Sequence, residues 1–112
     1  MMLVLNTGSS SIKIAVFDAA LDLVIEGNIA GVGQAGRMTL GGDKTDVTCT
    51  DHADALDHLL DGLVARGIRL DQITAAAHRV VHGGRRLTAP CRITDETITQ
   101  IKAMIPLAPL HN

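Results

Sequence analysis

Two short apolar segments, separated by a run of small polar residues, begin the chain. They cover Met2 to Leu5 and Ile12 to Phe17. The first is too short for a helix, and the second is rich in β-branched side chains, which favour strands. The intervening Asn-Thr-Gly-Ser-Ser-Ser is typical of a turn. This pattern predicts an N-terminal β-hairpin.

Predicted strands continue beyond this hairpin. A turn at 18–22 leads into a third strand, Leu23 to Val32. A glycine-rich stretch follows, in which Arg37 to Leu40 and Asp46 to Cys49 are weaker strand candidates. They flank a Gly41-Gly42 turn, so a second hairpin is a weaker expectation than the first.

An amphipathic helix is predicted from Asp51 to Arg66. Its apolar side chains recur with the spacing of one helix face: Leu56, Leu59, Leu60, Leu63 and Val64. Asp51 and Asp54 lie in the first turn, where the helix dipole favours negative charge. Gly67 is well placed to end the helix.

A buried strand and a second helix complete the pattern. The strand is predicted from Ile73 to Val81, before the Gly83-Gly84 pair. The helix is predicted to begin near Thr94 and to end at Pro106. Together the elements predict an α/β fold of two or three layers, built as one domain over residues 1–112.

Composition and charge narrow the possible function classes. The 112 residues carry a net charge of −2, which gives no electrostatic basis for binding a nucleic acid backbone. The N-terminal segment lacks a basic region, and no apolar run reaches membrane length, so no membrane partner is expected. Cys49 and Cys91 are interpreted as reduced core residues. A cytoplasmic protein is the simplest inference.

The turn between the first two strands has the composition of a phosphate site. Gly8 lets the backbone approach a ligand closely, and the serines, among them Ser9 and Ser11, offer hydroxyl and N–H groups to phosphate oxygens. Asn6 could meet a hydrated magnesium ion, and Lys13, inside an apolar strand, needs an anion to offset its desolvation. The motif is not a P-loop, because the second glycine and the Lys-Ser/Thr pair are absent. A phosphate-binding hairpin and a serine-rich turn with Lys13 on a solvated face are the two alternatives.

A second polar motif, residues 78–84, lies at the end of the later strand. Alternation places Arg79 and Val81 on one face, where a guanidinium beside an apolar group could hold a small carboxylate bearing a methyl, such as acetate. A structural ion pair is the alternative for Arg79. His78 and His82 would lie about 13 Å apart on an extended strand, too far to share one metal ion. Hydrogen bonds within the protein are therefore the interpretation for both histidines.

The other three histidines lie outside the 78–84 motif. His52 and His58 lie on or beside the polar face of the predicted helix and are interpreted as solvated. His111 follows Pro109-Leu110, a position suited to the start of a new element. Residue type alone favours a structural role for it.

Three motifs, taken together, are similar to those of a known family. NTGSSSIK at 6–13, HRVVHGG at 78–84 and LAPLHN at 107–112 resemble, in order and spacing, motifs of the acetate kinase family, over essentially the whole chain. The resemblance implies the duplicated fold shared with actin, hexokinase and Hsp70 ATPase domains. This chain would be a ribonuclease H-like lobe, a mixed α/β sheet with flanking helices. Departures are small: Ala77 stands where many relatives have Gly, and Arg85 where they have an acidic residue.

On the nucleotide side, the resemblance implies ATP or ADP as partner and Mg²⁺ as cofactor. Asn6 would help to position the magnesium ion, and Lys13 would reach the nucleotide phosphates. Ser9 and Ser11 would border the path of the transferred phosphate. The implied reaction is reversible phosphoryl transfer between ATP and acetate, giving ADP and acetyl phosphate.

On the acyl side, the resemblance implies a small pocket for acetate or acetyl phosphate. Arg79 would bind the carboxylate, and Val81 and Leu110 would contact the methyl group. His111 would be a catalytic residue near the transferring phosphoryl group. Propionate kinase remains an alternative, since one methylene is worth only about 1–3 kcal/mol of discrimination, although Val81 favours acetate.

The family also has parts that follow position 112 of this sequence. They include the catalytic aspartate, a second histidine and arginine, the adenosine-binding segments and a glutamate for magnesium. We therefore expect residues 1–112 to be a truncated first lobe, inactive alone, with the second lobe absent. The complete enzyme is expected to be a homodimer. The alternative of another class is a non-catalytic module that assembles with a separate second half.

Overall fold

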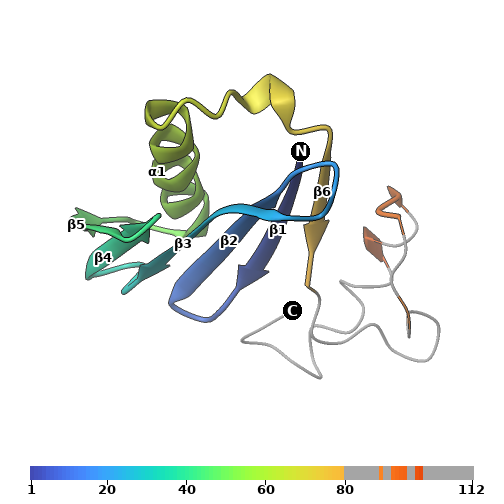
Figure 1. The fold of residues 1–112 in the computed structure, drawn as a ribbon. Helices are drawn as coiled ribbons and strands as arrows, with labels where there is room; N and C mark the ends of the chain where they lie inside the picture. Colours follow the sequence, from blue (N-terminus) through green and yellow to red (C-terminus); the bar gives the residue numbers. More distant parts are fainter. Residues whose placement is uncertain (80–88, 90–91, 96–97, 100–112) are drawn as a thin grey trace. The chain divides into compact units, whose positions relative to one another are not determined.

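Figure 1 shows the fold of the chain in a computed structural model. The structure describes residues 1–79, 89, 92–95 and 98–99. The chain divides into two units, Met1–Arg79 and Val80–Asn112. In the first unit a short 3₁₀ helix, η1 (Leu70–Gln72), lies in the chain between the main helix and the last strand of the sheet.

A six-stranded sheet forms most of the first unit. In their side-by-side order, the strands are β5 (Asp43–Thr48), β4 (Ala35–Leu40), β3 (Leu23–Ala30), β2 (Ser11–Phe17), β1 (Met2–Thr7) and β6 (Ala75–His78). Neighbouring strands are antiparallel, except that β1 and β6 are parallel. The predicted N-terminal hairpin is confirmed as β1 and β2, and the mixed sheet agrees with the predicted α/β class.

Helix α1 (His52–Ala65) packs on one face of the sheet, against β2, β3 and β4 (Figure 1). The Asp51 carboxylate accepts the N–H of Asp54 at 2.8 Å and so caps the first turn. Gly67 has a φ of +83°, the left-handed conformation that ends a helix without strain from a Cβ atom. The predicted amphipathic helix and its two ends are confirmed.

The hydrophobic core lies between α1 and the sheet. Alternate residues of β2 point into it, and Ile12, Ile14 and Val16 are all buried. They pack in one cluster with Leu59 and Leu63 of α1, whose side chains are 0% exposed. Removing this apolar surface from water is the main force that holds α1 on the sheet. The opposite face of the sheet is left open by the helix.

Three strand predictions differ from the structure in detail. The later strand was predicted to be buried over Ile73 to Val81, but all four residues of β6 are exposed. Burial was the wrong prediction because β6 is the last strand of the sheet and α1 packs on β2 to β4 instead. Strand β3 stops at Ala30, since Gly31 takes a φ of +80° and begins a turn. The two weak strand candidates form complete strands, because β4 and β5 pair with each other.

The second unit confirms part of one further prediction. Ile98 and Thr99 are helical, and the Ile98 N–H donates to the carbonyl oxygen of Thr94 at 2.9 Å. This bond spans four residues, as in an α-helix, and agrees with a helix that begins near Thr94. The predicted end at Pro106 lies outside the described residues.

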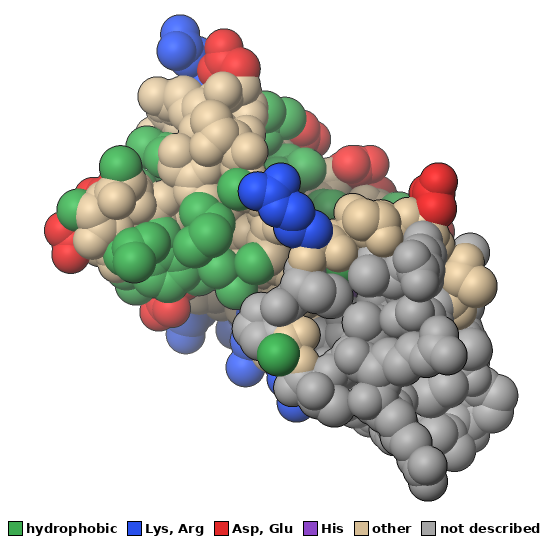
Figure 2. Space-filling view, turned by 90° about the vertical axis from the view of Figure 1, so that its right-hand side faces the viewer, with side chains coloured by type: hydrophobic (Ala, Val, Ile, Leu, Met, Phe, Trp, Pro, Cys, Tyr) green, Lys and Arg blue, Asp and Glu red, His purple; other side chains and the backbone are tan. Residues whose placement is uncertain are grey.

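The described surface contains both charged and large apolar side chains. On the face that Figure 2 shows, hydrophobic side chains gather in a patch, with Lys or Arg side chains at its border. Seven large apolar residues of the described chain are exposed: Leu21, Leu23, Val24, Val64, Leu70, Ile93 and Ile98.

Cys49 is buried and free, as predicted. Over the described ranges, no helix has the length and apolarity that crossing a bilayer requires.

Candidate functional site

The open face of the sheet, opposite α1, carries a row of polar side chains. The strand register pairs Asn6 with Lys13, Lys13 with Asn28, and Asn28 with Thr39. Directly paired residues of neighbouring strands project from the same face, so these side chains form one row across β1 to β4. All four line a groove of about 600 Å³. The fold thus brings Asn6 and Lys13 together as a cross-strand pair.

Lys13 lies on this open face with an exposed side chain. Of the two alternatives for Lys13, the solvated face is therefore confirmed. The argument that it needs an anion to offset desolvation was wrong, because its neighbours Ile12 and Ile14 point into the core and Lys13 does not. An exposed ammonium group at the groove can still attract an anion, without first being desolvated. Glu26 lines the same groove, so the groove carries both signs of charge.

Asn28 is a groove residue that the sequence did not single out. Its Oδ1 atom is buried and has no hydrogen-bond partner within the described part of the chain. Leaving a buried acceptor unpaired costs about 1–3 kcal/mol, so a donor on a bound molecule would stabilise this position. The only signal in the sequence was its position as one of two polar residues, with Glu26, inside a largely apolar strand.

The turn between β1 and β2 is held by three hydrogen bonds. The Gly8 N–H donates to the Ser11 carbonyl and the Val32 N–H to the Ser10 carbonyl, both at 2.8 Å. The His52 Nε2 atom lies 2.7 Å from the Gly8 carbonyl oxygen. Because a carbonyl can only accept, Nε2 carries the proton and donates. The interpretation of His52 as solvated was therefore wrong: it joins the start of α1 to the turn.

Close packing also fixes the residue type within this turn. A Cβ atom at Gly8 would lie 2.6 Å from the Ser11 Oγ atom, so a larger residue there would displace the hydroxyl. Ser9 is exposed at the tip, and Ser11 is partly buried where β2 begins. Their hydroxyl and N–H groups have the chemistry to bind phosphate oxygens, and the turn is held in place before any ligand arrives.

Replacing His52 with Ala should loosen the turn. The variant leaves the Gly8 carbonyl without its donor, so we expect a loss of about 1 kcal/mol in the free energy of unfolding of the chain. Urea unfolding followed by circular dichroism measures this loss. The control is His58→Ala, because His58 is on the same helix but makes only an exposed contact with Asp54 at 3.7 Å. Both variants are measured in EDTA, so that no metal ion affects the comparison. Equal losses for the two variants would contradict the role of His52.

His78, the last residue of β6, connects this strand to β1. Its Nε2 atom lies 2.8 Å from the Thr7 Oγ1 atom, and its Nδ1 atom lies 2.8 Å from the Arg79 carbonyl oxygen. The carbonyl accepts, so Nδ1 carries a proton, and in the neutral ring Nε2 accepts from the Thr7 hydroxyl. This confirms that His78 is satisfied by hydrogen bonds. His82 lies outside the described residues.

Arg79 continues the parallel pairing of β6 with β1. The register runs from Met2 opposite Ala75 to Leu5 opposite His78, and the Arg79 N–H donates to the Leu5 carbonyl at 3.0 Å. One further step along this register sets Arg79 beside Asn6. Arg79 is exposed and directly follows β6, and directly paired residues of neighbouring strands project from the same face. We therefore expect its side chain on the face that carries Asn6 and Lys13.

The remaining predicted site residues belong to the second unit. Val81, Leu110 and His111 lie outside the described residues, so their roles stay predictions. The predicted residues of the first unit fall into two groups: Asn6 and Lys13 on one face of the sheet, where we also expect Arg79, and Ser9 and Ser11 at the adjoining turn.

A second hollow, of about 640 Å³, lies over the ends of β4 and β5. It contains Arg37 and Asp46, whose side chains form an ion pair at 3.4 Å and are largely exposed. Because the two charges already compensate each other, this hollow offers less to a charged ligand than the groove does.

Comparison with known proteins decides the family. The family model described as the acetokinase family matches residues 1–112. This chain belongs to the acetokinase family. The acetate kinase of Deinococcus deserti is 39% identical, over 98% of this chain and 29% of that protein. The acetate kinase of a Geobacillus species is 39% identical, over 99% of this chain and 30% of that protein. The chain thus spans about 30% of the length of these curated relatives.

Solved structures agree with this assignment and with the fold. The crystal structure of Porphyromonas gingivalis acetate kinase matches with a TM-score of 0.90 and 32% identity, over 99% of this chain and 31% of that one. A propionate kinase from Francisella tularensis matches with a TM-score of 0.85 and 32% identity, over 98% of this chain and 30% of that one. The acetokinase chain has the predicted ribonuclease H-like lobe architecture, which is confirmed.

Two residues of this acetokinase chain that support the candidate site were missed by sequence reasoning. Asn28 was read as part of a strand, and His52 as a solvated helix residue. Neither belongs to a motif, so only strand register and the packing of α1 beside the turn could reveal them.

Proposed function

We propose that this chain is part of an acetate kinase, which transfers phosphate reversibly between ATP and acetate. In the forward direction an acetate oxygen bonds to the γ-phosphorus of ATP, and the bond from that phosphorus to the β,γ-bridging oxygen breaks. The products are acetyl phosphate and ADP. The proposal is supported chiefly by the cross-strand pair of Asn6 and Lys13, which lies beside the serine turn (residues 8–11, between β1 and β2). The backbone N–H of Arg79 is bonded to the Leu5 carbonyl of the same β1 strand.

On the nucleotide side, Lys13 and the turn would bind phosphate oxygens. Lys13 is exposed at the groove, and its ammonium can approach a phosphate group as a point charge. Asn6 fits a magnesium site, because its amide oxygen is the hard ligand type that Mg²⁺ accepts and its side chain is exposed beside Lys13. Bound magnesium would neutralise charge on the nucleotide phosphates. The hydrogen bonds of the turn would hold Ser9 and Ser11 in position for the phosphate oxygens.

On the acyl side, Arg79 would bind the carboxylate of acetate with its planar guanidinium. His78 would act as a positioning residue, because it fixes the backbone of Arg79 to Thr7 through two hydrogen bonds of 2.8 Å. We assign the methyl pocket to Val81 and Leu110, and a place near the transferring phosphoryl group to His111, on the resemblance of their motifs.

We expect residues 1–112 alone to lack turnover, because they span only about 30% of the length of the curated acetate kinases that they match. The test compares acetyl phosphate formation from ATP, magnesium and acetate by residues 1–112 alone and by the chain joined to the rest of the enzyme. Turnover only in the joined form supports the proposal. We expect the complete enzyme to be cytoplasmic and homodimeric. Robust turnover by residues 1–112 alone would contradict the need for a second lobe. No turnover in either form would favour the non-catalytic module.

Propionate is the alternative acyl substrate. The propionate kinase of F. tularensis has the same 32% identity to this chain as the P. gingivalis acetate kinase, so overall likeness does not separate the two substrates. The ratio of kcat/KM for acetate to that for propionate, measured on the complete enzyme, separates them.

Val81→Ala should shift this ratio toward propionate. The smaller side chain leaves room for one more methylene, which is worth about 1–3 kcal/mol, or roughly 5- to 150-fold in kcat/KM. Leu60→Ala is a control, because Leu60 packs against the core through α1. A ratio unchanged by Val81→Ala would remove this residue from the methyl pocket.

A further inference from the structure

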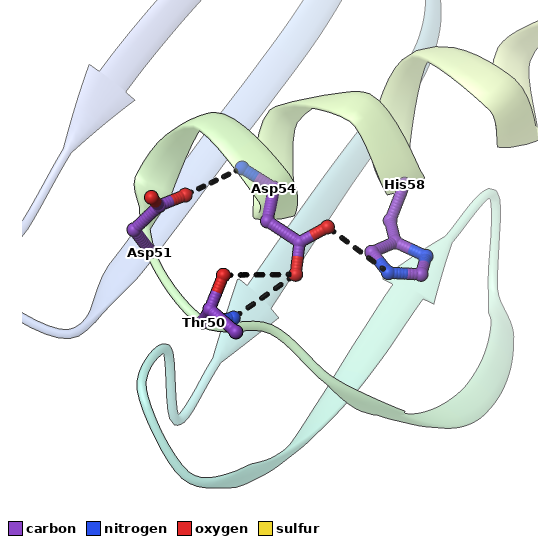
Figure 3. Close-up of polar contacts among 4 residues, drawn as sticks. All are labelled: Thr50, Asp51, Asp54 and His58. Atoms are coloured by element: carbon purple, nitrogen blue, oxygen red, sulfur yellow. Dashed lines mark hydrogen bonds and ion pairs between the residues drawn. The ribbon is translucent and has the colours of Figure 1, made fainter.

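Three metal-ligating side chains converge where β5 leads into α1, away from the groove. Cys49 follows β5, and Asp54 and His58 lie on the first two turns of α1. Their ligand atoms all lie within 4.8 Å of one another. Asp54 Oδ1 and His58 Nε2 are 3.7 Å apart, and Figure 3 shows these two side chains turned toward each other.

We propose that Cys49, Asp54 and His58 bind a zinc ion or a similar divalent transition-metal ion. One sulfur, one nitrogen and one oxygen ligand suit zinc, whereas magnesium prefers oxygen ligands alone. Around a tetrahedral zinc ion, such ligand atoms lie roughly 3.2–3.6 Å from one another. The Asp54–His58 separation of 3.7 Å is already close to this value, and the sulfur lies within 4.8 Å of both ligand atoms, so small side-chain movements would close the site. Water would be the fourth ligand.

Neighbouring hydrogen bonds hold the cluster in place. The other carboxylate oxygen of Asp54 accepts the Thr50 N–H at 3.0 Å and the Thr50 hydroxyl at 3.5 Å (Figure 3). This leaves Oδ1 directed at His58. The carbonyl of Cys49 accepts the Gly33 N–H at 2.7 Å, which fixes the backbone on the sulfur side. Such outer contacts orient ligands before a metal binds.

Access to the cluster comes from one side. The Cys49 residue is 1% exposed, whereas the side chains of Asp54 and His58 are 38% and 42% exposed. A metal ion can therefore enter past the helix side chains and meet the sulfur at the inner end. The i, i+4 spacing on the helix would explain why Asp54 and His58 meet, but not why the Cys49 thiol lies within 4.8 Å of both.

Metal binding must displace a proton from the thiol. Burial, and then the charges of Asp54 and Asp51, raise the pKa of Cys49, so the free thiol is protonated near neutral pH. The ligand is the thiolate, and the proton leaves to solvent as the sulfur–metal bond forms. Affinity should consequently rise with pH up to the pKa of the thiol, because less work is then needed to remove the proton.

The test uses the 112-residue chain with Cys91→Ser, so that Cys49 is the one remaining thiol. Co²⁺ is added to metal-free protein as a spectroscopic probe, because a thiolate ligand gives a charge-transfer band in the near ultraviolet. We expect this band, its displacement by Zn²⁺, and its persistence in excess Mg²⁺. His58→Gln and Asp54→Asn should each weaken Co²⁺ binding at least about tenfold, because losing even a residue that only orients a ligand costs about 10- to 100-fold in affinity. Cys49→Ala should abolish the band.

Asp57→Asn is the matched control, since Asp57 is an exposed carboxylate of the same helix outside the cluster. It should leave Co²⁺ binding unchanged. His58→Gln alters a half-exposed side chain, so its result does not depend on repacking of the core, as that of Cys49→Ala does. The absence of a thiolate band, or equal Co²⁺ binding by His58→Gln and the parent chain, would overturn the proposal.

Discussion

Replacing Arg79 with Ala in the complete enzyme should raise the KM for acetate about 10- to 100-fold. Hydrogen bonds to a charged group contribute about 1.5–3 kcal/mol, and the neutral variant would lose the guanidinium that we assign to the carboxylate. The KM for ATP should change less than about threefold, because Lys13 and the serine turn bind the nucleotide side in this proposal. Steady-state kinetics with each substrate varied in turn measures both values.

Two further variants make the Arg79 test specific. Arg79→Lys keeps the charge but loses the planar pair of donors, so its acetate KM should lie between those of the parent and of Arg79→Ala. Arg69→Ala removes another arginine, one whose contact with Asp71 is an exposed ion pair at 3.3 Å. It should leave both KM values unchanged. An unchanged acetate KM in Arg79→Ala would exclude this residue from the acyl pocket.

Gly36→Ala should destabilise the chain by about 3 kcal/mol, a large fraction of the stability of a domain of this size. The added Cβ atom would lie only 2.2 Å from the carbonyl oxygen of Ala30 and 3.0 Å from that of Gly31. Both are backbone atoms of the neighbouring strand or its turn, so β3 and β4 must move apart. Urea unfolding followed by circular dichroism measures the loss, because the sequence has no tryptophan or tyrosine for fluorescence.

Gly33→Ala separates close packing from backbone strain. Gly33 has a φ of +88°, but the nearest atom to an added Cβ lies 4.0 Å away. Its substitution should cost about 1–2 kcal/mol, from the left-handed conformation alone. Equal losses at the two positions would show that steric contact with β3 is not what requires glycine at 36.

The sequence predicted the elements that depend on neighbouring residues. The apolar period of 51–66 and its acidic first turn were enough for α1, because helix packing and capping follow from spacing along one segment. The hairpin β1–β2 was predicted for the same reason, since its strands are joined by a short turn. The sequence left both a desolvated and a solvated environment open for Lys13, because an apolar run does not reveal which alternate residues the helix will cover.

By itself, then, the sequence determined the family and the local elements: its motifs persist whatever they contact, and helix and hairpin patterns act over a few residues. The tertiary structure decided which side chains meet. The contacts of His78 with Thr7 and of His52 with Gly8 join positions 71 and 44 residues apart. The convergence of Cys49 with Asp54 and His58 likewise depends on how α1 lies over the sheet. Such contacts follow from strand register and helix packing, which the whole core sets together.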